Sequence, residues 1–220
     1  MTRENNIIAK NLLQIKAIKL SPQNPFTWAS GLKSPIYCDN RITLSYPEIR
    51  DNIKHGFIEI VHDLKEVNHI SAVATAGIAH GAILADALDL PFSYVRSSAK
   101  KHGRQNRIEG FIEPGSNVLV IEDLISTGKS SIEAVEVLRA EGHNILAVAS
   151  IFTYDLMSSK HNFMNAKCIS KSITSYSELL DEAVKMGYVG ADEEELLKQW
   201  NADPEEWSEI YEKNKYGSIQ

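Results

Sequence analysis

The sequence predicts an α/β domain built on a twisted, mostly parallel sheet with helices on both faces. Apolar runs alternate with helical patterns between residues 70 and 152, and this alternation is typical of repeated strand–helix–strand units. One run, Val118–Ile121, is apolar without alternation, as expected for a parallel strand covered on both faces. Turns rich in glycine and small residues follow two of the expected strands, at the sheet edge where such proteins bind ligands.

The N-terminal part predicts a helix followed by irregular structure. Four apolar residues recur at helical spacing, namely Ile8, Leu12, Ile15 and Ile18. We expect one amphipathic helix that is interrupted at Ser21-Pro22 and packs as a flap over the core. Residues 26–50 are rich in turn formers but also carry three aromatic side chains, which indicates a short hairpin or loop that shapes a pocket.

The middle of the chain carries the strand and helix patterns of the core. A helix over about 48–64 is indicated by apolar residues at spacings of three and four. Strands and helices then alternate over 70–76, 77–90, 91–96, 117–124, 130–140 and 144–152. Right-handed connections between such strands produce an open, twisted sheet.

Beyond Ile173 the pattern changes to polar helices over about 177–186 and 192–200, followed by a charged tail. The apolar residues of the first helix are expected to be core contacts, namely Leu179, Leu180, Val184 and Met186. No catalytic chemistry is visible in this part of the chain.

Composition limits the classes of partner. The chain has 220 residues, 43% hydrophobic and 24% charged, with a net charge of −6, so we expect one large core and no nucleic acid or anionic membrane as partner. Cys38 and Cys168 are too few for a disulfide framework or a metal cluster. Charged residues break the apolar pairs near the N-terminus, and the apolar run 145–149 is too short to span a bilayer. These features favour a cytoplasmic protein.

The stretch from Val118 to Ser131, VLVIEDLISTGKSS, predicts a sugar-phosphate site. The expected strand leads into two carboxylates, Glu122 and Asp123, and then into a turn that supplies hydroxyls and a glycine. Free backbone amides at the start of the following helix attract phosphate. The paired acids suit a ligand with hydroxyl groups, such as a ribose.

Two other interpretations account for part of this stretch. Gly128-Lys129-Ser130 matches the end of a nucleotide P-loop, but that motif requires a glycine at the position of Asp123. A carboxylate there would face the triphosphate. A surface turn with a capping hydroxyl would explain the turn, but it leaves the paired acids unexplained.

A basic segment lies between two of the expected strands. RSSAKKHGRQNRI, from Arg96 to Ile108, contains five Lys or Arg residues, His102 and no acid. A solvated basic loop is one interpretation. Because the segment precedes the sugar-phosphate strand, we favour a loop that closes over a multiply charged anion and excludes water.

Three motifs together resemble the type I phosphoribosyltransferases, and within them the orotate enzymes rather than the purine enzymes. SGLKSPIYCDNRITLSYP is followed by R...KKHG....IEG and then by IEDLISTGKS, all within Phe26–Ser131. The resemblance implies transfer of the phosphoribosyl group from phosphoribosyl pyrophosphate to orotate, with Mg²⁺ held mainly by the substrate. It implies one domain over 1–220, in which 1–47 contribute a small hood and 174–220 form a helical appendage. It also implies a homodimer in which loop 97–109 reaches the partner's active site.

The resemblance also assigns roles to residues. Glu122 and Asp123 would hold the ribose hydroxyls, and Ser126 would lie near orotate. The turn would wrap the 5'-phosphate through Leu124, Ile125, Ser126, Thr127, Gly128, Lys129 and Ser130. Arg96, Lys100 and His102 would contact the pyrophosphate, and Ala76–Gly81 would lie around the pyrophosphate and base. For Gly81, a tight turn with helix packing is the alternative. The catalytic set would be Lys100, His102 and Asp123, with no covalent nucleophile.

The chain departs from the family pattern at several positions. Ser97 and Ala29 replace lysines, Ser126 and Lys129 replace the commoner threonine and glycine of the turn, and no arginine follows Ile151-Phe152. The partner of the orotate carboxylate therefore stays open among Lys33, Arg41 and backbone amides near Tyr37. A regulatory protein that only senses phosphoribosyl pyrophosphate is a further alternative, although such a sensor has little need for the basic loop.

Overall fold

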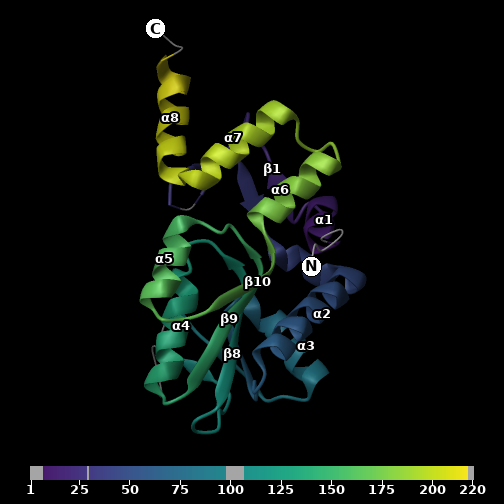
Figure 1. Ribbon diagram of the computed structural model, residues 1–220, viewed down its shortest axis with the longest axis vertical. Coiled ribbons are helices and arrows are strands. Elements are labelled where there is room, and N and C mark those ends of the chain that lie inside the picture. The colour runs from purple at the N-terminus through teal and green to yellow at the C-terminus, as the bar shows by residue number, and fades with distance from the viewer. Residues whose placement is uncertain (1–6, 29, 98–106, 218–220) are drawn as a thin grey trace.

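The computed structural model describes residues 7–28, 30–97 and 107–217 (Figure 1). The elements in chain order are α1 (Ile7–Gln14), β1 (Ile18–Leu20), β2 (Phe26–Thr27), β3 (Lys33–Ser34), β4 (Ile36–Cys38), the 3₁₀ helix η1 (Asn40–Ser45), α2 (Pro47–Leu64), β5 (His69–Val73), α3 (Gly77–Leu88), β6 (Phe92–Val95), β7 (Ile108–Glu109), β8 (Asn117–Ile125), α4 (Lys129–Ala140), β9 (Asn144–Thr153), α5 (Met157–Asn165), β10 (Ser170–Ser175), α6 (Tyr176–Lys185), α7 (Ala191–Ala202) and α8 (Pro204–Gly217).

The main sheet of the described chain has the strand order β10-β9-β8-β5-β6-β7. All neighbours are parallel except β6 and β7, which pair antiparallel. The predicted α/β class with a mostly parallel sheet is therefore confirmed. The strand β8 lies inside the sheet between β5 and β9, so its carboxyl end is flanked by the ends of both neighbours.

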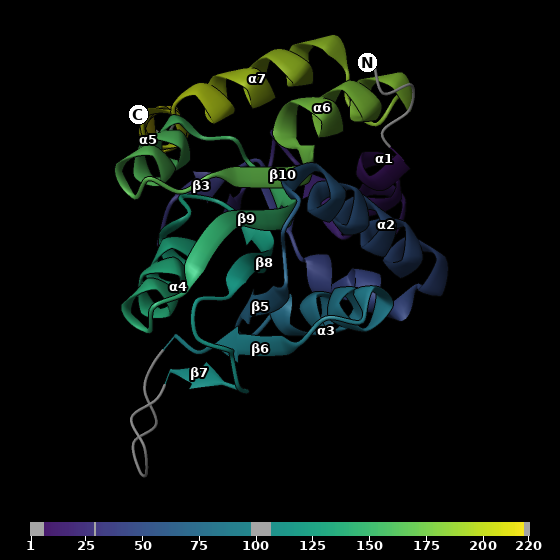
Figure 2. The same ribbon diagram turned by 60° about the horizontal axis from the view of Figure 1, so that its bottom comes forward.

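Helices cover both faces of this sheet, with α2 and α3 on one side and α4 and α5 on the other (Figures 1 and 2). The strand β8 contributes to both cores because its side chains alternate between faces. Leu119 and Ile121 belong to the core under α2 and α3, whereas Val118 and Val120 belong to the core under α4. All four side chains are fully buried, which explains why the run shows no polar alternation.

The N-terminal helix is shorter than predicted. It ends at Gln14, and Ile18 begins β1, which pairs antiparallel with β4. Lys16 has a φ of 58°, a left-handed conformation that a continuing helix cannot contain. Helical spacing continued past this residue, so the prediction of one helix up to Ser21 was wrong.

The C-terminal part contains more structure than predicted. α5 and β10 were not foreseen, and the predicted charged tail is the helix α8. Leu179 and Leu180 are buried, but Val184 and Met186 are each 38% exposed, so their assignment to the core was wrong. Val184 lies in the last turn of α6, and Met186 caps that helix next to Gly187, whose φ is 66°.

None of the described helices is both long enough and apolar enough to cross a membrane.

Candidate functional site

The junction between β8 and α4 forms a tight turn at the carboxyl end of the sheet. Gly128 caps α4 with a φ of 77°, a conformation that favours glycine. A Cβ atom added to Gly128 would lie 2.5 Å from the Phe163 ring of α5. The turn therefore passes close to α5, and Asn162 Nδ2 also donates a hydrogen bond to the Thr127 carbonyl at 3.0 Å. The first backbone N–H groups of α4, which have no partner within the helix, therefore lie at this turn.

The Glu122 side chain fixes this turn through hydrogen bonds. It is only 5% exposed, and its Oε2 accepts hydrogen bonds from Ser130 Oγ and Ser131 Oγ, both at 3.3 Å. Its Oε1 accepts from the Asp123 backbone N at 3.1 Å. Burial, followed by the neighbouring charge of Asp123, raises the pKa of Glu122 to about 8. The carboxyl group therefore joins the strand end to the first turn of α4.

Asp123 lies next to Glu122, and burial also raises the pKa of this carboxyl. Its backbone carbonyl accepts a hydrogen bond at 2.7 Å from Nδ2 of Asn40, which is fully buried. Sequence reasoning missed Asn40, although it belongs to the quoted motif SGLKSPIYCDNRITLSYP. A buried amide directly after the short strand β4 fixes the position of the second acid.

Arg41 was a candidate partner for the orotate carboxylate. Its Nε and Nη2 atoms donate to the two Asp39 carboxylate oxygens at 2.7 and 2.9 Å. The guanidinium lowers the pKa of Asp39 and also acts on that of Asp123. The other candidates lie nearby in the chain: Lys33 Nζ donates to Thr27 Oγ1 at 2.7 Å, and the Tyr37 ring lies 5.7 Å from Phe26.

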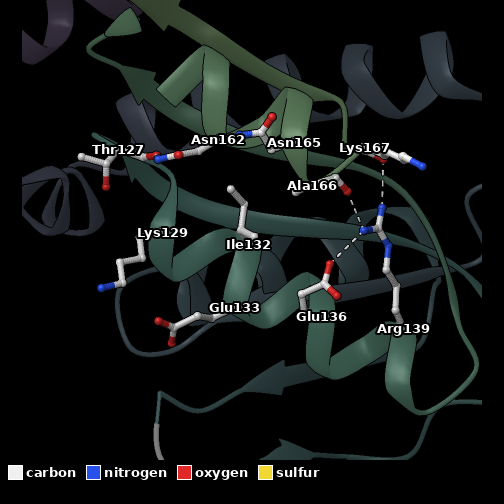
Figure 3. A pocket seen from close by; sticks show the side chains of 10 residues that line it. All are labelled: Thr127, Lys129, Ile132, Glu133, Glu136, Arg139, Asn162, Asn165, Ala166 and Lys167. Carbon is white, nitrogen blue, oxygen red and sulfur yellow. Dashed lines mark hydrogen bonds and ion pairs between the residues drawn. The ribbon is translucent and has the colours of Figure 1, made fainter. Parts of the chain in front are cut away.

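Two adjoining hollows lie where the turn opens α4. The smaller, of about 380 Å³, is lined by Leu124, Ser126, Thr127, Gly128, Lys129, Ser130 and Glu133. It thus gathers six of the seven turn residues that were predicted to hold phosphate. The larger, of about 1050 Å³, is an open groove between α4 and α5 that is lined mostly by polar and charged residues (Figure 3). Arg139 closes its far end by donating to the carbonyls of Ala166 and Lys167.

The ends of the basic segment are joined beside the turn. The Arg96 backbone N donates to the Arg107 carbonyl at 2.8 Å, and Arg107 Nε donates back to the Arg96 carbonyl at 2.9 Å. Arg96 also forms an ion pair with Glu109, and Arg107 Nη2 lies 3.7 Å from a Glu133 carboxylate oxygen. This last contact connects the segment to the first turns of α4. Lys100 and His102 lie outside the described residues.

The predicted segment Ala76–Gly81 lies at the carboxyl end of β5, the parallel neighbour of β8. A Cβ atom on Gly77 would lie 2.6 Å from the Ile121 carbonyl oxygen, so only glycine lets α3 start this close to β8. His80 is buried against Thr43, with Nε2 and Oγ1 3.3 Å apart, and burial lowers its pKa to about 4. The segment therefore places backbone atoms at the site, whereas the His80 side chain is buried in the protein interior.

Comparisons with known proteins identify the family of this chain. A family model described as phosphoribosyl transferase domain matches residues 44–175. The orotate phosphoribosyltransferase of Lactococcus lactis subsp. cremoris is 50% identical over 201 residues, which cover 91% of this chain and 96% of that protein. The orotate phosphoribosyltransferase of Porphyromonas gingivalis is 48% identical, with the same coverage. The crystal structure of orotate phosphoribosyltransferase from Aeropyrum pernix is similar with a TM-score of 0.73 at 27% identity, covering 83% of this chain and 99% of that one.

Proposed function

We propose, from the premise that this chain belongs to the phosphoribosyl transferase domain family and is an orotate phosphoribosyltransferase, that the β8–α4 junction holds the phosphoribosyl group during transfer. The enzyme transfers this group from phosphoribosyl pyrophosphate to orotate, giving orotidine 5'-phosphate and pyrophosphate for pyrimidine biosynthesis. The observation that carries the site assignment is the pair Glu122-Asp123 directly below the turn that opens α4.

The 5'-phosphate is assigned to the turn Leu124–Ser130. The hollow of about 380 Å³ is lined by its backbone and hydroxyl groups, and α4 directs its N-terminal amides and positive dipole end toward it. Lys129 is exposed and adds a positive charge at the rim. Glu133 also lines the hollow, and its negative charge is offset by Arg107.

The ribose is assigned to the acids. Asp123 accepts from the ribose hydroxyls, while Glu122 fixes Ser130, Ser131 and the Asp123 amide. As the bond between C1' and the pyrophosphate oxygen breaks, positive charge develops on the ribose, and the nearby Asp123 carboxylate favours it. Orotate N1 releases its proton to solvent and bonds to C1' from the opposite face, and the pyrophosphate leaves with the electron pair of the broken C1'–O bond. Because this direct displacement needs no covalent enzyme intermediate, no nucleophile is assigned.

The pyrophosphate is assigned to Arg96, Lys100 and His102, with Lys100, His102 and Asp123 as the catalytic set. The leaving group gains negative charge, so cations near it lower the barrier. Mg²⁺ is assigned to the substrate, which would hold it mainly through the pyrophosphate. When bound there, Mg²⁺ supplies further neutralisation of the leaving group.

The proposed site is tested by Asp123→Asn, with Asp181→Asn on the exposed face of α6 as the matched control. We expect kcat/KM for orotate phosphoribosylation to fall at least a hundredfold in the first variant and to stay at the parent value in the second. Both should unfold at nearly the parent temperature, because neither change removes core packing. Parent-like catalytic efficiency in Asp123→Asn would show that the ribose assignment is wrong.

We also propose a cytoplasmic homodimer in which loop 97–109 of one subunit serves the partner's site. The ion pair between Arg107 and Glu133 shows where the loop returns to its own α4, but residues 98–106 lie outside the described chain. The test mixes Lys100→Ala and Asp123→Ala subunits after dissociation. If the loop acts across the interface, about a quarter of all sites regain both intact parts. If each loop serves its own subunit, the mixture stays inactive after verified exchange.

Residues 1–47 are proposed as a hood over the site, and 174–220 as a helical appendage. The antiparallel pairs β1–β4 and β2–β3 support the first assignment, because they stand apart from the main sheet. The helices α6, α7 and α8 support the second, because they follow the last strand of the sheet.

A further inference from the structure

The hairpin β2–β3 is too small to hold its own position. Each strand has two residues, paired as Phe26 with Ser34 and Thr27 with Lys33. An isolated hairpin is marginal in water even when its strands are longer. Its placement must therefore come from contacts with the rest of the chain.

One such contact comes from the last helix. Ser208 of α8 is 5% exposed, and its Oγ accepts a hydrogen bond at 2.9 Å from the backbone N of Lys33 in β3. The two residues are 175 positions apart in the chain. Losing the hydroxyl would leave a part-buried backbone donor without this partner, which costs more than the bond itself gains.

A second contact comes from α7. The fully buried Trp200 packs edge-on against Trp28, which follows β2, with 5.7 Å between ring centroids. Both rings also contact Tyr154, at 5.5 and 5.6 Å, directly after β9. Asn201 Nδ2 donates to the Tyr154 carbonyl at 2.7 Å. The helix α7 is therefore fixed both to the hairpin and to the end of a central strand.

A cavity of about 300 Å³ connects these contacts to the turn. The hairpin contributes Trp28 and Leu32 to its wall, the turn contributes Ser126 and Thr127, and the junction of α7 and α8 contributes residues 201–205. The C-terminal helices thus hold the hairpin and also line the space between the hairpin and Ser126.

We propose that α7 and α8 form a C-terminal clamp that positions the hairpin at the orotate end of the site, with Ser208 as a positioning residue. The inference rests on the proposed function for the location of orotate beside Ser126. No residue of α7 or α8 lines the hollow assigned to the 5'-phosphate, so we expect loss of the clamp to act on orotate and to spare phosphoribosyl pyrophosphate.

The test compares Ser208→Ala with Ser177→Ala, an exposed serine of α6 that serves as the matched control. Hydrogen exchange of residues 26–35 measures the clamp without reference to activity, and steady-state kinetics measures KM for each substrate. In Ser208→Ala we expect faster exchange of the hairpin amides and a KM for orotate about three- to tenfold higher, the effect of one lost hydrogen bond. The KM for phosphoribosyl pyrophosphate should stay within twofold of the parent.

Unchanged hairpin exchange in Ser208→Ala, or an equal rise of both KM values, would overturn the clamp. If the parent protein consumes no orotate, the proposed function fails, and the exchange measurement alone decides whether the C-terminal helices hold the hairpin. The control variant should match the parent in both measurements.

Discussion

Replacing Glu122 by glutamine is expected to stabilise the folded chain at alkaline pH and to flatten the dependence of its stability on pH. Burial raises the pKa of this carboxyl from 4.5 to about 8. Between pH 4.5 and 8 the Glu122 carboxyl is protonated in the folded chain but ionised in the unfolded chain. The free energy of unfolding therefore falls as pH rises through this window, and the penalty is absent below about pH 4.5.

The size of the effect follows from the pKa difference. Each pKa unit corresponds to about 1.4 kcal/mol, so the upper bound above pH 8 is about 5 kcal/mol. We expect the variant to be more stable by roughly 2 kcal/mol, because Glu122 and Asp123 share their proton and Asp123 accounts for part of the change in protonation. Glutamine can keep the local bonds: its oxygen accepts from the Asp123 amide, and its NH₂ group donates to the hydroxyls of Ser130 and Ser131.

The assay is chemical denaturation of the parent and Glu122→Gln at several pH values between 4.5 and 9. We expect the two free energies of unfolding to converge at the acid end and to separate as pH rises, with the variant more stable. Glu136→Gln, an exposed position on α4, is the matched control and should follow the parent curve. Parallel curves for the parent and Glu122→Gln would refute the claim that burial of this carboxyl costs stability.

Three further predictions concern the turn and its supports. In denaturant titrations, Gly128→Ala should lower the free energy of unfolding by about 1–3 kcal/mol more than Gly115→Ala does. Both glycines have a φ near 75°, but only Gly128 faces an aromatic ring. Equal losses of stability in the two variants would contradict the packing argument. Asn40→Ala should lower the free energy of unfolding by about 1–3 kcal/mol and kcat/KM about tenfold, because the Asp123 carbonyl loses its hydrogen bond. A parent-like kcat/KM would show that Asn40 does not position Asp123. Neither the parent nor Lys129→Gly should release phosphate from ATP, and hydrolysis that the substitution removes would favour a P-loop enzyme.

The parts of the fold that the sequence predicts well are those in which burial leaves a strong pattern. Val118–Ile121 is apolar because it is covered on both faces, and the paired acids follow it where the strand meets the turn. By contrast, β10 has only two buried residues, Ile173 and Thr174. An edge strand that is polar on most positions has no clear periodicity, so β10 could not be separated from the loop before it.

The supports of the site were harder to foresee than its acids. Asn40 is 83 residues from Asp123 in the chain, and only the folded structure brings its amide to that carbonyl. The helix α8 is rich in charged residues, with four glutamates and two lysines among its 14 residues, so it resembled a charged tail. Its contact with Lys33 depends on the backbone of β3, and no side-chain pattern encodes such a contact.

The central claim is that this chain transfers a phosphoribosyl group to orotate, and the most direct measurement is the consumption of the base itself. Purified protein is mixed with Mg²⁺, phosphoribosyl pyrophosphate and one base at a time, and ultraviolet absorbance is followed for orotate, uracil, adenine and hypoxanthine. We expect orotate alone to be consumed, with one pyrophosphate released for each orotate. Consumption of a purine base instead, or binding of phosphoribosyl pyrophosphate without consumption of any base, would contradict the claim.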